Sequence, residues 1–152
     1  MLIISLLAAL LTVTPSQEEQ KSYWLTAGGD DYYVFVEGRS VVREGPVVAA
    51  WTAYVFAPDR RPTSGAWAMH IRQEWDCVAR KGRQVAVAVF DENFQVIESA
   101  SSDIEEWEVV FPDSISEATM SVLCDGQTPP AIIEAASLRD LTTRFLASLP
   151  PQ

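Results

Sequence analysis

The chain has 152 residues, a length typical of one domain, and carries 11 basic against 21 acidic side chains for a formal net charge of −10. Proteins that bind nucleic acid neutralise phosphates with Lys and Arg, so this balance argues against DNA or RNA as a partner. The main basic concentration, RKGR at 80–83, is explained as well by a solvated turn as by a contact patch.

The N-terminus is apolar. Residues 2–13, LIISLLAALLTV, carry no charge and precede a polar segment with helix-breaking Pro15. This run is too short to cross a bilayer, which takes about 20 residues, but it matches the apolar core of a secretory signal peptide. We therefore expect a signal peptide over 1–16, cleavage near Gln17, and a mature protein without a transmembrane span. A buried first helix is the alternative, since no Lys or Arg precedes the run, and the true start could lie further upstream.

From about residue 22 the pattern is one of short strands separated by turn residues. The strand over 66–77 alternates, so that Trp75 and Cys77 share one face while His70 lies on the other. Cys77 is therefore expected on the covered face and His70 on the polar, exposed face. The other expected strands span 32–36, 46–58, 84–90, 94–99 and 106–111, and 84–90 and 94–99 form a hairpin around Asp91-Glu92-Asn93.

Two C-terminal helices complete the expected fold. Ser114 and Glu117 have the spacing of a capping box, which favours a helix up to Cys124, although its period also suits a strand. Its inward residues are expected to be Ile115, Ala118 and Val122, with Cys124 at its end. A second helix is expected from 131 to 148, on the helical spacing of Leu138, Leu141, Phe145 and Leu149. The predicted class is α+β, an antiparallel sheet of about five to seven strands with the C-terminal helices packed on one face.

The chain has two cysteines. If the protein is exported, the simple expectation is a disulfide between Cys77, at the end of a strand, and Cys124, at the end of the helix that covers it. The bridge would tie that helix to the sheet and close a loop of about 47 residues. Free thiols in the cytosol are the alternative. A zinc site is disfavoured, because there is a single histidine and no C-x₂-C pair.

Several segments together resemble the bacterial surface-adhesin protein E family. They are VFVEGRSVVREGPVVAAW, EWDCVARKGRQVAVAVFD and EEWEVVFPDSISEATMSVLCDG. The positions that carry the resemblance are Glu37, Ser40, Arg43, Gly45, Trp51, Asp76, Cys77, Trp107, Pro112, Ser114 and Cys124. It covers about 23–126, so we expect a domain over 22–126 and a helical extension over 127–152. Glu37 and Asn93 stand where the family pattern leads us to expect Asp and Gly.

The resemblance implies an exported sheet with a helix held against it by the disulfide, and a protein partner of host matrix or plasma origin. No cysteine follows the signal segment, so no lipoprotein anchor is expected, and the location is periplasmic, secreted or at the cell surface. The resemblance places no ligand-binding residue.

No enzyme motif stands out. A catalytic triad would have to use His70, which is expected on the face away from Cys77, and the Asp30-Asp31 and Glu105-Glu106 pairs are typical of solvated loops. We therefore expect a non-enzymatic binding module without cofactor. A small periplasmic structural domain is the alternative, and an unrecognised hydrolase is a distant third.

Overall fold

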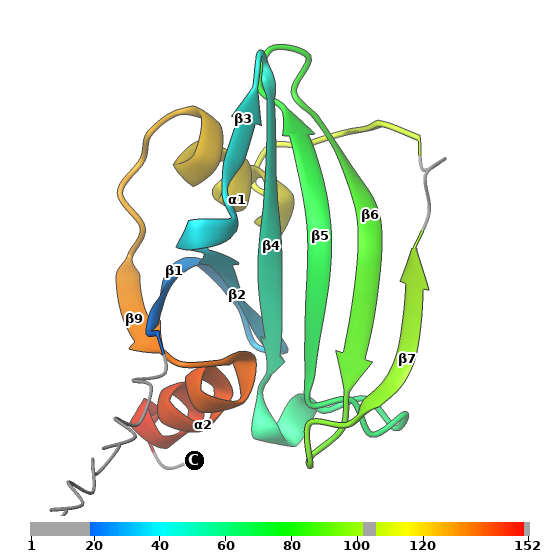
Figure 1. Cartoon of the computed structure of the whole chain (residues 1–152), viewed down its shortest axis with the longest axis vertical. Helices are drawn as coiled ribbons and strands as arrows, with labels where there is room; N and C mark the ends of the chain where they lie inside the picture. Colours follow the sequence, from blue (N-terminus) through cyan, green and yellow to red (C-terminus); the bar gives the residue numbers. More distant parts are fainter. Residues whose placement is uncertain (1–18, 102–105, 151–152) are drawn as a thin grey trace, which may run out of the picture.

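The computed structural model describes residues 19–101 and 106–150, and these form one antiparallel sheet with two α-helices (Figure 1). The central strand order is β7-β6-β5-β4-β2-β1-β9, with β3 paired to β4 and β8 paired to β6. The nine strands are β1 (Lys21–Gly28), β2 (Tyr32–Glu37), β3 (Val42–Glu44), β4 (Val47–Phe56), β5 (Ala68–Asp76), β6 (Lys81–Phe90), β7 (Val96–Ser101), β8 (Glu108–Val109) and β9 (Ala131–Ala135). The helices are α1 (Ile115–Cys124) and α2 (Leu138–Ser148), and two 3₁₀ turns are η1 (Gly38–Ser40) and η2 (Pro58–Arg60).

The central strands bury both of their faces. In β4, Val48 and Ala50 belong to one core cluster, whereas Ala53 and Val55 belong to a second one. Successive side chains of a strand point to opposite faces, so the two clusters lie on opposite sides of the sheet. A sheet buried on both faces requires apolar residues at consecutive positions, which is what the sequence of β4, VVAAWTAYVF, supplies.

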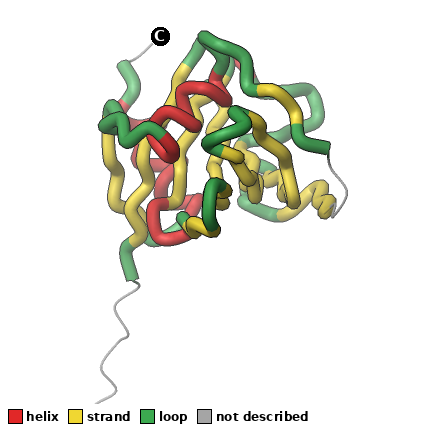
Figure 2. The backbone as a smooth tube through the Cα atoms, turned by 90° about the horizontal axis from the view of Figure 1, so that it is seen from above, coloured by secondary structure: helices red, strands yellow, loops and turns green. Residues whose placement is uncertain are grey.

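The two helices cover opposite faces. Met120 and Leu123 of α1 pack into the first cluster, with Trp75, and Leu141 and Phe145 of α2 pack into the second. Figure 1 shows α1 behind the sheet and α2 at the lower end of its front, and Figure 2 shows the helical segments against the strands from above. The predicted α+β class, with its disulfide-tethered helix, is confirmed, but the helices do not share one face. The sequence showed their apolar positions, not the face against which each packs.

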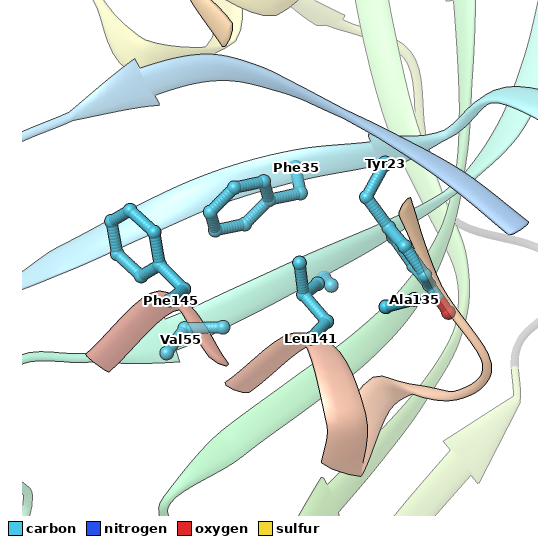
Figure 3. Close-up of a cluster of buried hydrophobic side chains, with 7 residues drawn as sticks. Tyr23, Phe35, Val55, Ala135, Leu141 and Phe145 are labelled. Carbon is cyan, nitrogen blue, oxygen red and sulfur yellow. The ribbon is translucent and has the colours of Figure 1, made fainter. Parts of the chain in front are cut away.

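The α2 face has an aromatic core (Figure 3). The Phe145 ring lies 5.0 Å from the Phe35 ring and 4.6 Å from the Tyr33 ring, measured between centroids, and both contacts are edge-to-face. Aromatic pairs favour this geometry over a face-to-face stack. Tyr23 and Leu141 complete the cluster and are almost fully buried. Because Tyr23 is buried, its hydroxyl has a pKa raised above the ordinary value, with smaller contributions from Glu37 and Asp140.

The predicted C-terminal helix is too long. Residues 131–135 form β9, which pairs antiparallel with β1, and the helix begins only at Leu138, with Ser137 as its N-cap. The five residues of β9, AIIEA, are too few to show whether their apolar positions repeat as in a strand or as in a helix. The pairing with β1, a distant segment of the chain, decides that they form a strand. β1 was not identified as a separate strand from the sequence, and together with β9 and the short β3 it raises the six expected strands to nine.

The predicted start of α1 is confirmed, but its predicted inward stripe is wrong. Ser114 Oγ accepts a hydrogen bond from Glu117 N at 3.1 Å, as a capping box requires. The buried residues of α1 are Thr119, Met120, Ser121 and Leu123. The expected stripe is displaced because the hydroxyl of Thr119 faces inward and bonds Thr26 of β1 at 2.8 Å. An interpretation based on the spacing of apolar residues does not predict that a threonine is buried, because the hydroxyl group that bonds it is not known from the sequence.

Two loop predictions need correction. The predicted hairpin forms, since β6 pairs antiparallel with β7, but its turn is residues 91–95, with a positive φ of 56° at Phe94. Asp91 supports this turn by accepting hydrogen bonds from the backbone N–H of Asn93 and Gln95. The predicted strand over 106–111 is reduced to the two residues of β8. No helix within the described ranges has the length and apolar character needed to cross a membrane.

Candidate functional site

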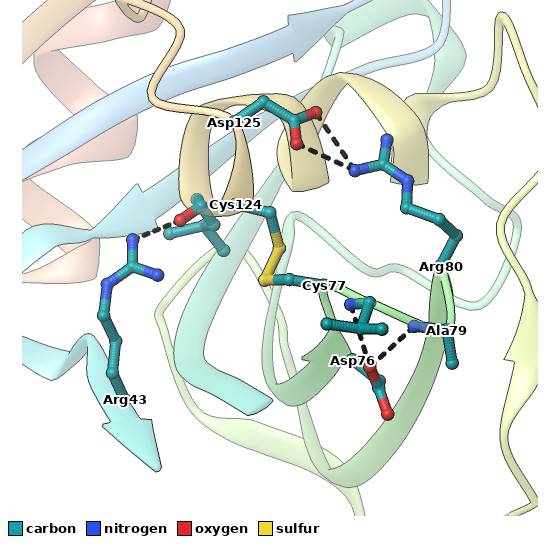
Figure 4. A network of polar contacts seen from close by, with 9 residues as sticks. Arg43, Asp76, Cys77, Ala79, Arg80, Cys124 and Asp125 are labelled. Carbon is teal, nitrogen blue, oxygen red and sulfur yellow. Dashed lines mark hydrogen bonds and ion pairs between the residues drawn. A yellow bond between two sulfur atoms is a disulfide. The ribbon is translucent and has the colours of Figure 1, made fainter. Parts of the chain in front are cut away.

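Cys77 and Cys124 form a disulfide that joins the end of β5 to the end of α1 (Figure 4), with Cα atoms 5.4 Å apart and a sequence separation of 47. The bridge is flanked by a salt bridge, in which Arg80 Nη1 lies 3.0 Å from Asp125 Oδ1. The guanidinium of Arg43 donates a hydrogen bond to the carbonyl oxygen of Leu123. All three contacts fasten the C-terminal end of α1.

Several other positions that carry the family resemblance also have structural roles. Asp76 caps the turn after β5, because its Oδ1 accepts hydrogen bonds from Val78 N at 3.0 Å and Ala79 N at 2.8 Å. Gly45 has a φ of 59°, in the left-handed region that glycine adopts without strain, at the turn between β3 and β4. Ser40 Oγ donates to Glu37 O and accepts from Trp51 N at 2.8 Å, which joins η1 to β4.

These residues therefore build the scaffold. They fix α1, η1 and two tight turns, and Ser114 caps the helix. The contacts that these residues make do not by themselves identify a surface that binds a partner.

A groove of about 1120 Å³ lies on the α1 face of the sheet. Its floor comes from Tyr32, Tyr54, Gln73 and Trp75 of β2, β4 and β5, and from residues 82–84 of β6. One wall is the segment from β8 to the start of α1, which includes Glu108 and Phe111. The groove lies beside α1, which contacts β1 and β2 and packs Met120 and Leu123 against a cluster that includes Trp75.

Aromatic side chains are prominent in the groove. The rings of Tyr32 and Tyr54 lie 5.4 Å apart between centroids. Burial raises the pKa of Tyr54 to about 12, with a further contribution from Tyr32, while the hydrogen bond with Gln73 acts in the opposite direction. The Tyr54 hydroxyl is therefore protonated at neutral pH and can both donate and accept a hydrogen bond. Phe111, on the wall, is 68% exposed and is available for contact.

The charges of the groove favour cations. Arg83 is neutralised by Glu74, with its Nη2 2.6 Å from Glu74 Oε2, and its guanidinium carbon lies 4.7 Å from the centroid of the Trp107 ring. Glu106 and Glu108 also line the groove, and neither forms an ion pair within the described residues. The groove is thus an aromatic floor with an acidic wall.

Sequence reasoning missed this groove because it is assembled from segments far apart in the chain. The local signal was the alternation of apolar residues with glutamates over 106–111, which we interpreted as an ordinary strand. Asp30 and Asp31, considered as an acid–base pair, lie exposed in the turn before β2. Among residues 19–101 and 106–150, no three His, Cys, Asp or Glu side chains are arranged to hold a metal ion.

The prediction that His70 is a surface residue is wrong. His70 lies on the face opposite Cys77, as expected, but its side chain is only 21% exposed. Its ring lies 4.7 Å from the Trp51 ring, and its Nε2 is 3.7 Å from Glu37 Oε2. Alternation showed which face His70 occupies but not that Trp51 covers that face. Its Nε2 has no hydrogen-bond partner among the described residues.

This environment makes stability depend on pH. Burial lowers the pKa of His70 below its ordinary value, with Glu37 opposing the shift and Lys21 reinforcing it. Because the unfolded chain then binds a proton at a higher pH than the folded chain, His70 reduces stability as pH falls through the unfolded pKa of about 6.5. We expect the His70→Gln variant to lose less stability than wild type between about pH 7.5 and pH 5. Urea denaturation at several pH values measures this, and parallel curves for the two proteins would contradict it.

Comparisons with known proteins found one family and a set of similar solved structures. The family model of surface-adhesin protein E matches residues 24–125. Two solved structures of Haemophilus influenzae protein E resemble the chain, with TM-scores of 0.49 and 0.48 at 15% and 16% sequence identity. They cover 80% and 78% of this chain, and 98% and 92% of their own. No curated protein matches the sequence. Since the family model spans well over half of the sequence, the chain belongs to the surface-adhesin protein E family.

Proposed function

We propose that the protein is an exported, non-enzymatic binding module that contacts a protein partner at or outside the cell envelope. Membership of the surface-adhesin protein E family carries this proposal, because surface adhesion requires export and a partner rather than a reaction. The disulfide supports it, since disulfides persist in oxidising compartments such as the periplasm and the cell surface.

The groove on the α1 face is the contact surface that fits this function best. Protein interfaces are enriched in Tyr, Trp and Phe, and a few such residues contribute most of the binding energy. Tyr32, Tyr54 and Phe111 offer these side chains on a rigid sheet and on the segment that leads into α1. A surface that is already ordered before binding avoids part of the entropy cost of association.

The partner segment should be basic. Glu106 and Glu108 form the acidic wall, and the whole chain carries a net charge of −10. Opposite charges on the two partners accelerate association and make it sensitive to salt. A segment with Lys or Arg beside an aliphatic or aromatic side chain would match both the wall and the floor of the groove.

The test uses three purified proteins: wild type, Phe111→Ser in the groove, and Val78→Ser as a control. Val78 is 82% exposed and does not line the groove. Against a panel of immobilised extracellular-matrix and plasma proteins, we expect at least one to bind wild type and Val78→Ser equally. Phe111→Ser should bind it about 10-fold more weakly or worse, because an aromatic anchor is lost.

Two outcomes would contradict the proposal. Equal binding by all three proteins would show that the groove is not the contact surface. Failure of the whole panel, together with a soluble periplasmic pool in cell fractions, would favour the alternative of a periplasmic structural domain without an extracellular ligand.

A further inference from the structure

A second cavity, of about 420 Å³, lies beside α2 and shares no lining residue with the groove. It is bounded by Pro58 of η2, by Trp67 just before β5, by the 91–95 turn, and by one side of α2. This size falls within the range of about 300–1,000 Å³ that is typical of small-molecule sites.

Two guanidinium groups line this cavity, each placed over an aromatic ring. The guanidinium carbon of Arg61 lies 3.4 Å from the centroid of the Trp67 ring, and that of Arg139 lies 5.3 Å from the centroid of the Phe94 ring. A guanidinium that stacks on a ring keeps its N–H donors at the edge of its own plane, where they can bind a carboxylate with two hydrogen bonds. Arg139 is held further by a hydrogen bond to the carbonyl oxygen of Asn93.

Neither arginine has a carboxylate partner within the described residues. Of the other seven arginines, five form ion pairs with Asp or Glu, namely Arg39, Arg60, Arg80, Arg83 and Arg144, and Arg43 and Arg72 bond backbone carbonyl oxygens. In a chain with 21 acidic side chains, the two guanidinium groups give this cavity a local excess of positive charge. Glu92 is the one acidic residue in the lining, and it is outnumbered there.

Arg61 is incompletely satisfied as well. Its Nε is buried and has no hydrogen-bond acceptor among the described residues. Burial lowers the pKa of Arg61 below its ordinary value, and Glu92 opposes this only in part. An anion beside the guanidinium would offset the cost of that burial.

The rest of the lining is largely apolar. Trp67, Phe94 and Leu146 form its walls, and the hydroxyl of Thr142 already donates to Leu138 O at 2.9 Å. Most of a ligand would therefore lie against apolar surface, with its charge at the two arginines.

We propose that this cavity is a binding site for a small organic acid, whose carboxylate lies at Arg61 and Arg139 and whose apolar body packs against Trp67 and Phe94. The site is independent of the groove and of the proposed protein partner.

Calorimetric and NMR titrations with benzoate, indole-3-acetate and hexanoate test this site, with the neutral amide of each acid as the control ligand. At least one acid is expected to bind saturably and to shift the Trp67 indole resonance, while its amide binds far more weakly. Arg61→Gln and Arg139→Gln should each weaken that acid about 10- to 100-fold, the range for losing a hydrogen bond between charged groups. Glu92→Gln should strengthen it, because a competing carboxylate is removed.

The matched control is Arg60→Gln, one residue away, since Arg60 is exposed and lies near Asp59 rather than at the cavity. Equal weakening by Arg60→Gln, equal affinity for acid and amide, or no saturable binding by any of the three acids would overturn the proposal. If Arg61→Gln fails to fold because its packing on Trp67 is lost, the exposed Arg139 carries the same test.

Discussion

Replacing Cys77 with Ser is expected to lower the free energy of unfolding by about 2–5 kcal/mol, the usual range for removing a native disulfide from a small secreted domain. The bridge closes a loop with a sequence separation of 47, for which the chain-entropy estimate is about 4 kcal/mol. Cys124→Ser should have the same effect, and the double variant should lose no more than either single one, because all three remove the same bond. Urea denaturation of the four proteins measures this, and additive losses would contradict it.

Reduction of the wild-type bridge should act locally. The bridge holds the end of α1, whereas α2 packs into its own cluster on the other face and β9 pairs with β1. Hydrogen exchange should therefore rise first in residues 115–124, while 131–148 and the central strands stay protected. Simultaneous loss of protection in α1 and α2 would show that the two helices are not held independently.

Replacing Leu141 with Ala is expected to cost about 2–5 kcal/mol, the range for removing a fully buried leucine side chain. Leu141 is completely buried and contacts the cluster that includes Tyr23, Phe35 and Phe145. The cost combines lost burial with the cavity that the rigid sheet cannot fill. Although the family model ends at residue 125, α2 is therefore part of the core of this chain.

The control for Leu141→Ala is Thr143→Ala, an exposed position on the same helix, whose stability should change by about 0.5 kcal/mol or less. Thermal and urea unfolding of both variants measure the difference. A loss below about 1 kcal/mol for Leu141→Ala would mean that α2 contributes little to the folded domain.

The predictions that succeeded from sequence were those that depend on local pattern. The alternation in 66–77 placed Cys77 and His70 on opposite faces, and the Ser114–Glu117 spacing located the start of α1. The predictions that failed depend on what another part of the chain supplies. Trp51 covers His70, Thr26 binds Thr119, and β1 converts 131–135 from the expected helix into a strand.

The groove and the second cavity were beyond sequence reasoning for the same reason. Tyr54, Trp75 and Phe111 meet in the groove from three separate segments, and Arg61 and Arg139 meet at the cavity from segments still further apart. Within its own segment, each of these side chains is consistent with an ordinary core or surface position. The arrangement becomes informative only when the sheet and both helices bring these side chains together.

Export is the claim on which the disulfide and any partner outside the cell depend. The segment that carries it, the signal peptide expected over 1–16, lies outside the described residues. Intact-mass spectrometry of the protein purified without reductant from its native host tests export directly, with thiol alkylation after unfolding. We expect a chain that begins near Gln17 and takes up no alkylating reagent at Cys77 or Cys124. A chain that keeps Met1 and is alkylated at both cysteines would contradict export and the bridge together.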